Sequence, residues 1–197
     1  MKPKDIGTDS DRALLLDFQA TLEIKPEKAI KLEKDALAQI ENITADNARL
    51  VSNLHANLGG LYRMNGHPDL AREHMEKSIS LLDQFNLLHI NDSIPQIANY
   101  AMFLTEQQEP ERGISELQKL SGIIKEYHSD DCLDYAKVQE TLGTIYLMTA
   151  NLPQAKTHFK RAFKIYEKIW ADEPEMIEAK YQEIQELYPQ IGFCIGK

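Results

Sequence analysis

The sequence lacks the features that a membrane-bound or secreted protein needs. Its 197 residues contain no apolar run near the roughly 18 residues of a membrane-spanning helix. No signal peptide is recognised, because Asp17 interrupts the only leucine run near the start of the chain. The two cysteines, Cys132 and Cys194, lie far apart and fit neither a metal motif nor a disulfide framework. We therefore expect a cytoplasmic protein with no membrane contact.

Positive charge is also scarce. Against 31 Asp and Glu the chain has 22 Lys and Arg, which leaves a formal net charge of −9. An acidic surface repels phosphate backbones, so a nucleic-acid partner is not expected.

Catalytic and cofactor motifs are absent as well. There is no glycine-rich phosphate loop. His67 and His74 are seven residues apart without a carboxylate at ligand spacing, and we interpret them as surface residues. His128 and Cys132 are one helical turn apart, but no acid or oxyanion donor accompanies them. The sequence therefore predicts no catalytic residue, no metal, no cofactor and no enzyme activity.

Helical periodicity is what the sequence has in abundance. Hydrophobic residues make up 43% and charged residues 27%, as in an ordinary soluble protein. Apolar residues recur at i and i+4, and most prolines stand where the first turn of a helix is expected. These patterns predict an all-α fold of nine amphipathic helices. They fall into four pairs and one single helix, over about residues 10–43, 46–85, 93–127, 130–170 and 174–188.

The helix pairs repeat with a period of 42 residues. Small residues recur at this spacing at Ala29, Ala71, Gly113 and Ala155. A second series at the same spacing consists of Tyr62, Leu104, Tyr146 and Tyr188. Self-similarity at a period of 20 to 50 residues is typical of solenoids. Small residues would let the two helices of a pair approach closely, and aromatic residues would fill the space between pairs.

Two stretches, residues 55–78 and 139–162, carry the clearest copies of the repeat. Both contain Leu-Gly-x-x-Tyr, with a tyrosine at Tyr62 or Tyr146, followed by a turn at Gly66 or Ala150. This pattern resembles the tetratricopeptide repeat, in the longer form found in kinesin light chains. The resemblance implies an α-α superhelix of four hairpins over residues 10–170 with a capping helix at 174–188. Residues 1–9 would form an N-terminal tail and residues 189–197 an apolar C-terminal tail.

The same resemblance implies a non-enzymatic module that binds an extended peptide or helix of a protein partner. In such repeats the first helix of each pair lines a concave groove. The groove residues expected from the repeat phase are Arg49, Asn53, Asn57, Arg63, Asn99, Met102, Lys137 and Thr141. These residues predict a groove that is neutral to basic. Asn57 and Asn99 resemble an asparagine ladder that holds a ligand's main chain, although both could instead bond to neighbouring helices.

Two other functions fit parts of the pattern. The chain could be a structural or oligomerising repeat segment of a larger regulatory or signalling protein. A carboxylate clamp for chaperone tails is poorly matched, because only Asn99 and Lys137 fit it.

Ile191, Phe193 and Ile195 alternate in the tail, which we expect to cover the last helix or to pair with another molecule, such as a second copy of the chain.

Overall fold

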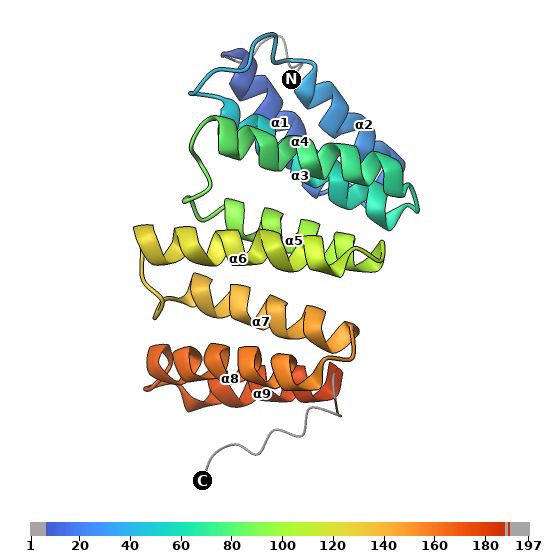
Figure 1. The fold of residues 1–197 in the computed structure, drawn as a ribbon. Helices are drawn as coiled ribbons and strands as arrows, with labels where there is room; N and C mark the ends of the chain where they lie inside the picture. The colour runs from blue at the N-terminus through green and yellow to red at the C-terminus, as the bar shows by residue number, and fades with distance from the viewer. Residues whose placement is uncertain (1–6, 188, 190–197) are drawn as a thin grey trace. The chain divides into compact units, whose positions relative to one another are not determined.

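The computed structural model describes residues 7–187 and 189, and all regular structure in that part of the chain is helical (Figure 1). The helices are α1 (Asp9–Thr21), α2 (Pro26–Leu37), α3 (Ala48–Met64), α4 (Pro68–Gln84), α5 (Ser93–Glu106), α6 (Pro110–Tyr127), α7 (Leu133–Met148), α8 (Leu152–Ile169) and α9 (Pro174–Leu187). Apart from Asp9, they fall within the predicted segments. Tyr188 and the apolar residues of the C-terminal tail lie outside the described residues, so the predictions for them stay predictions.

The chain divides into two units, residues 1–100 and 101–197, and α5 contributes to both. In the first unit α1 packs on α2, α2 on α3 and α3 on α4. Its N-terminal core consists of Ala13, Leu16, Ala36 and Leu54, from the first three helices. In the second unit α6 packs on α7, α7 on α8 and α8 on α9.

Close helix contacts use the small residues of the 42-residue series, as predicted. Ala29, Ala71 and Ala155 are buried. At Gly113 a Cβ atom would lie 2.6 Å from the carbonyl oxygen of Ala101, so α6 meets the backbone of α5 there. Any side chain at this position would force the two helices apart.

The turns inside the hairpins repeat with the same period. Gly66, Gln108 and Ala150 are 42 residues apart and have φ values of 73°, 65° and 59°. This left-handed conformation is easy for glycine and costly for residues with a Cβ atom. The backbone of the turn is therefore kept even where the sequence no longer supplies glycine.

The last helix closes the end of the second unit. Tyr181 of α9 meets Phe163 of α8 edge-on, with ring centroids 5.7 Å apart, and Ile184 is buried beside it. Lys180 forms an ion pair with Glu140 of α7 at 2.8 Å. In its described residues α9 therefore covers the hairpin before it, as a capping helix does.

Candidate functional site

Three hollows lie side by side in the first unit, lined by side chains from helices α1 to α5. Ala56 and Asn99 line all three, and Asn57 lines two. We name the hollows after a polar residue in each: the Gln96 pocket, the Asp92 pocket and the Glu33 pocket. The largest is the Glu33 pocket, with a volume of about 390 Å³.

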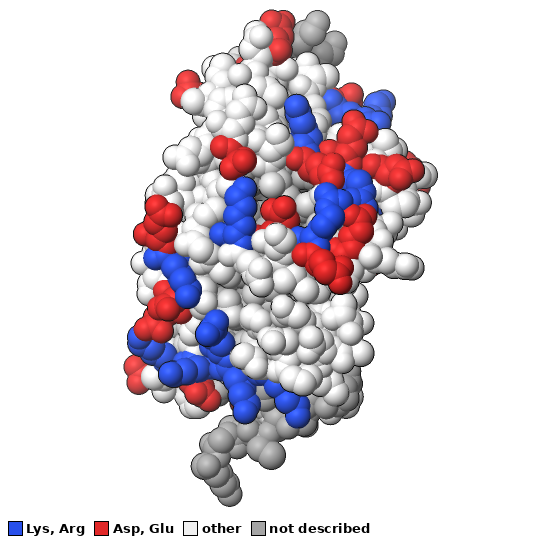
Figure 2. All heavy atoms as spheres, in the orientation of Figure 1, with Lys and Arg blue, Asp and Glu red and all other residues white. Residues whose placement is uncertain are grey.

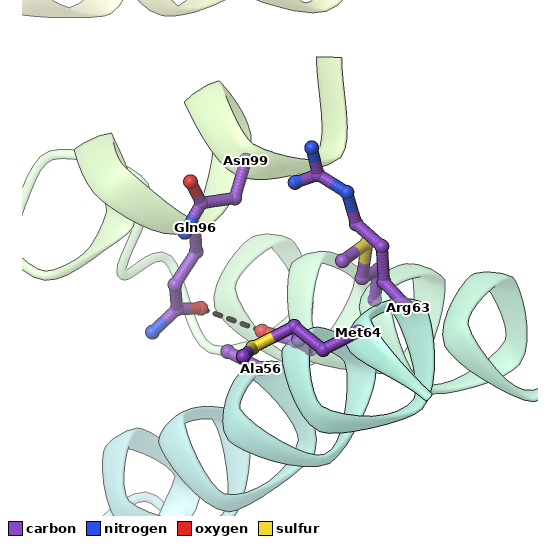
Figure 3. A pocket seen from close by; sticks show the side chains of 8 residues that line it. Ala56, Arg63, Met64, Gln96 and Asn99 are labelled. Atoms are coloured by element: carbon purple, nitrogen blue, oxygen red, sulfur yellow. Dashed lines mark hydrogen bonds between the residues drawn. The ribbon is translucent and has the colours of Figure 1, made fainter. Parts of the chain in front are cut away.

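The floor of the Gln96 pocket is a buried hydrogen-bond network. The hydroxyls of Ser52 and Ser78 both donate to Gln96 Oε1, at 2.9 and 2.5 Å. The amide nitrogen of Gln96 donates to Asn53 Oδ1 at 2.6 Å. Figure 3 shows the contact between Gln96 and the serine beneath it. Buried polar groups satisfied in this way hold the start of α5 in register with α3 and α4.

The rim of the Asp92 pocket is made of paired charges. Arg49 Nε donates to Asp92 Oδ2 at 2.6 Å, and Asn53 Nδ2 donates to the same oxygen at 3.2 Å. The hydrogen bond from Arg49 holds the pKa of Asp92 below its ordinary value. Arg49 therefore serves first as the partner of Asp92, a contact that spans 43 residues of sequence.

Glu33, which lines the Glu33 pocket, meets a second carboxyl group, that of Asp17, which lines the neighbouring Asp92 pocket. The side-chain amide of Asn57 donates to Asp17 Oδ1 at 2.9 Å and to Glu33 Oε1 at 3.1 Å. The second oxygen of Glu33, Oε2, is buried and accepts no hydrogen bond within the described residues. Burial raises the pKa of Glu33 to about 8. The charge of Asp17 and a hydrogen bond between the two carboxyl groups add to the rise, while the hydrogen bond from Asn57 opposes it. Of the two interpretations of Asn57, bonding to neighbouring helices is the one present in this structure.

Asn99 differs from Asn57. Its side chain is exposed, and within the described part of the chain it makes no hydrogen bond. Figure 3 shows Arg63 reaching from α3 up to the level of Asn99 on α5, with Met64 next along the helix. The Met64 side chain is 81% exposed. Asn99 thus offers both a donor and an acceptor at the centre of the three hollows.

The remaining predicted groove residues, Met102, Lys137 and Thr141, belong to the second unit. Lys137 Nζ lies 4.0 Å from Asp134, and the Thr141 hydroxyl donates to the backbone carbonyl of Lys137. Both side chains therefore make contacts within α7.

Only part of the predicted groove is brought together in one place. Asn53, Asn57 and Asn99 line the Asp92 pocket together. Arg63 shares the Gln96 pocket with Asn99. The structure thus gathers three of the predicted side chains, Asn53, Asn57 and Arg63, around Asn99, and all four belong to the first unit.

The hollows are more acidic than the sequence led us to expect. The Asp92 and Glu33 pockets are lined by Asp17, Glu23, Glu33 and Asp92, and no Lys, Arg or His lines either of them within the described residues. The prediction of a neutral to basic groove is therefore wrong for these two pockets, whereas the Gln96 pocket is lined by Arg63 and by no acid. Arg49 is neutralised by Asp92, and the acids of the first hairpin face the same hollows.

The basic side chains are found elsewhere. Figure 2 shows Lys and Arg gathered over α8, whose exposed face carries Lys156, Lys160, Lys164 and Lys168. Positive charge therefore lies on the second helix of a hairpin, where the repeat phase did not place the groove.

One further prediction needs correction. His74 is not a surface residue: it is half-buried, and its Nδ1 lies 2.9 Å from Nδ1 of His55. The ring of Tyr62 stacks on His74, with the centroids 5.4 Å apart. The signal for this pair was present in the sequence, because His55 and His74 stand on the two helices of one hairpin.

Two further features are absent from the described residues. The described residues contain no group of His, Cys, Asp or Glu side chains that could hold a metal ion. None of the helices described is long and apolar enough to cross a membrane.

Comparison with known proteins shows what the repeat is similar to. The tetratricopeptide repeat family matches residues 93–168. No curated protein matches the chain by sequence. Among solved structures, BtubC (BKLC) from P. vanneervenii is 20% identical, with a TM-score of 0.67, over 80% of this chain. This chain spans 62% of the length of BtubC.

Two further structures come from a candidate kinesin light chain of Podosopora anserina with nearly identical TPR-like repeats. Both are 13% identical to this chain, with TM-scores of 0.72 for a form with one substitution and 0.68 for the other. The matches cover 85% and 84% of this chain and 81% of each Podosopora chain. These similarities confirm the all-α repeat fold predicted from the 42-residue period.

Proposed function

We propose that this chain, whose tetratricopeptide repeats are of the kinesin light chain type, is a non-enzymatic scaffold of the cytoplasm that binds an extended segment of a protein partner. The binding surface consists of the three hollows of the first unit, with Asn99 at their centre. Asn53, Asn57 and Arg63 complete it, and Arg49 supports it through Asp92. On the second unit, the repeat phase alone supports Met102, Lys137 and Thr141 as further contacts.

A single observation carries this proposal. Asn99 is an exposed carboxamide that lines all three hollows and, in the described part of the chain, has no hydrogen-bond partner. A carboxamide can donate to a peptide carbonyl and accept from a peptide N–H at the same time, whatever side chains the peptide carries. The buried network beneath it, from Ser52 to Gln96, keeps this part of α5 in place, so that little freedom is lost on binding.

The test begins with a random peptide library selected against the full chain. Selected peptides are titrated by calorimetry into the wild type and into two variants. Asn99→Ala should weaken binding about 5- to 150-fold, because two hydrogen bonds are lost and each contributes ~0.5–1.5 kcal/mol. Gln118→Ala, which removes an exposed amide from α6, should leave the affinity unchanged.

Melting temperatures of both variants should equal that of the wild type, since neither side chain is buried. The proposal is overturned if no peptide is selected, or if selected peptides bind Asn99→Ala as tightly as the wild type.

A further inference from the structure

The first hairpin departs from the other three at one contact between its helices. In the 42-residue phase, Asp17 occupies the position of Gly59, Ala101 and Gly143. Glu33 occupies the position of Met75, Leu117 and Phe159. In the later hairpins this contact joins a small residue to a buried apolar one. A Cβ atom at Gly59 would lie 2.6 Å from Met75, and one at Gly143 would lie 2.9 Å from Phe159.

Two acids at this contact are costly to the fold. Glu33 is only 2% exposed, and a buried carboxylate loses its hydration. Asp17 adds a second negative charge, and a single Asn57 amide serves both groups. A pair of apolar residues would satisfy the packing without these costs, as it does in the other hairpins. The packing alone therefore gives no reason for the acids.

The pocket above the acids has the shape of a site for a long cationic side chain. Its walls are largely apolar, with Ala20, Ala29, Ile24 and Met64, and Ile24 is 93% exposed at the edge. Its polar groups include Glu33, the Asn57 amide and Glu23. Asp17 faces Glu33 from α1. Metal binding is not favoured, because the described residues do not provide a set of three metal ligands here.

We infer that the Asp17–Glu33 pair binds the ammonium group of a lysine side chain from the partner segment, and that the apolar walls hold the methylene stem of that lysine. This inference rests on the proposed function, since it names the chemistry of the segment that the hollows bind. Glu33 Oε2, which accepts no hydrogen bond from the described residues of the unbound chain, becomes an acceptor for the ammonium group. Lysine suits the pocket because its stem is apolar and its charge is confined to the tip.

The protons balance in a simple way. With its pKa raised to about 8, Glu33 is mostly protonated at pH 7. On binding, the O–H bond of the Glu33 carboxyl breaks and the proton passes to the buffer. The ammonium keeps its three protons and pairs with the carboxylate. Binding therefore releases close to one proton at pH 7. Below pH 7 the affinity falls by about tenfold for each unit by which the pH is lowered.

The groups that face Glu33 set this response. They are Asp17 on α1 and Asn57 on α3, and Glu23 also lines the pocket. Asp17 disfavours the charged form of Glu33, and Asn57 favours it. An ammonium group placed between the two acids would reverse the effect of Asp17, because a cation stabilises both carboxylates at once.

The experiment uses two small probes, N-acetyl-lysine N-methylamide and its norleucine counterpart, which has a similar stem but no charge. Each is titrated into the full chain at pH 6 and pH 8, and the Glu33 carboxyl and Asn57 amide signals are followed by NMR. We expect saturable shifts with the lysine probe only, at least tenfold tighter binding at pH 8, and a lower Glu33 pKa in the saturated protein. The inference is overturned if neither probe gives a saturable shift, or if both bind equally.

Two variants serve as controls. Glu33→Gln removes the titrating group and should make the remaining weak binding independent of pH between 6 and 8. Asp17→Gly with Glu33→Met installs the pair found in α3 and α4, so it should fold at least as well as the wild type and bind neither probe. Lysine binding that persists unchanged in this double variant contradicts the inference.

The result of the lysine-probe titration can be distinguished from the result of the Asn99→Ala titration. Selected peptides without lysine that still depend on Asn99 would support the proposed function and refute the lysine site. If Asn99→Ala leaves peptide affinity unchanged while the lysine probe still binds, the lysine site is supported and the proposed function is refuted.

Discussion

Hairpins α3–α4 and α7–α8 share one framework and differ in the polar groups that fill it. The framework includes Tyr62 and Tyr146, each stacked on a histidine of the second helix, with centroids 5.4 and 5.2 Å apart. The buried polar groups differ between the two hairpins. In the first of these hairpins Ser52 and Ser78 bond to Gln96, whereas the equivalent positions 84 residues later hold buried Ala136 and Ala162. The shared residues produce the fold, and the residues that differ determine where hydrogen-bonding groups are available.

The stacked histidine also has different partners. In α3–α4 His74 meets His55, with the two Nδ1 atoms 2.9 Å apart. In α7–α8 His158 meets the side-chain oxygen of Gln139, also at 2.9 Å. Histidine can be protonated near neutral pH and glutamine cannot, so only one of the two contacts consists of two titrating groups.

The largest change in stability is expected where the buried polar groups of the two hairpins differ most. Gln96→Leu removes the acceptor of two buried hydroxyls and should lower the free energy of unfolding by about 2–3 kcal/mol. Without Gln96 the two hydroxyls keep only each other and the Ser78 carbonyl as partners. Adding Ser52→Ala and Ser78→Ala, as in α7–α8, should recover most of that loss, because these under-satisfied buried hydroxyls are then gone. Urea denaturation measures the free energy of unfolding of the single and the triple variant. A triple variant no more stable than the single one would refute the role given to the network.

Much of the framework could be predicted from the sequence, because it obeys a strict period. Positions such as Ala71 and Gly113 are set by close backbone contact, which leaves a one-residue signal at fixed spacing. The contact of Arg49 with Asp92 carried no such signal, since it depends on where the α4–α5 connection places Asp92. The burial of Glu33 did leave a signal in the sequence, because Glu33 has the same position in the 42-residue period as buried Met75. That signal is found only when the repeats are compared position by position, including positions where an acid replaces an apolar residue.

Acid should destabilise α3–α4 more than α7–α8. Burial lowers the pKa of His55 to about 4, and also lowers that of His74, whereas an unfolded histidine titrates near 6.5. The unfolded chain thus binds more protons, so this contribution to stability is complete above pH 6.5 and falls as the pH drops toward 4. The loss due to His55 should be about 2 kcal/mol after allowing for its partial exposure to solvent.

Exchanging the histidine partners tests this difference. His55→Gln copies the pair of α7–α8 and should remove that part of the acid sensitivity. Gln139→His is the reciprocal change and should add sensitivity to α7–α8. Unfolding free energies at pH 7 and pH 5 for the three proteins make the measurement. Equal pH dependence in wild type and His55→Gln would mean that the histidine pair has no special role.

The smallest effect is expected at the hairpin turns. Gly66→Ala should cost about 1 kcal/mol, and Ala150→Gly should stabilise by a similar amount, because both residues have left-handed backbones. In a chain of this size that corresponds to about 2–4 °C in melting temperature, in opposite directions. Shifts of the same sign would show that the turns do not share one conformation.

The central claim is that the hollows around Asn99 form the binding surface. The most direct measurement is an NMR titration of the full chain with a peptide selected from the library, following the side-chain amides of Asn57 and Asn99 and the backbone amides of α8. We predict saturable shifts at Asn57 and Asn99, with the α8 signals unmoved. Shifts confined to α8, with its exposed lysines, would contradict the claim and place the binding surface on the basic face instead.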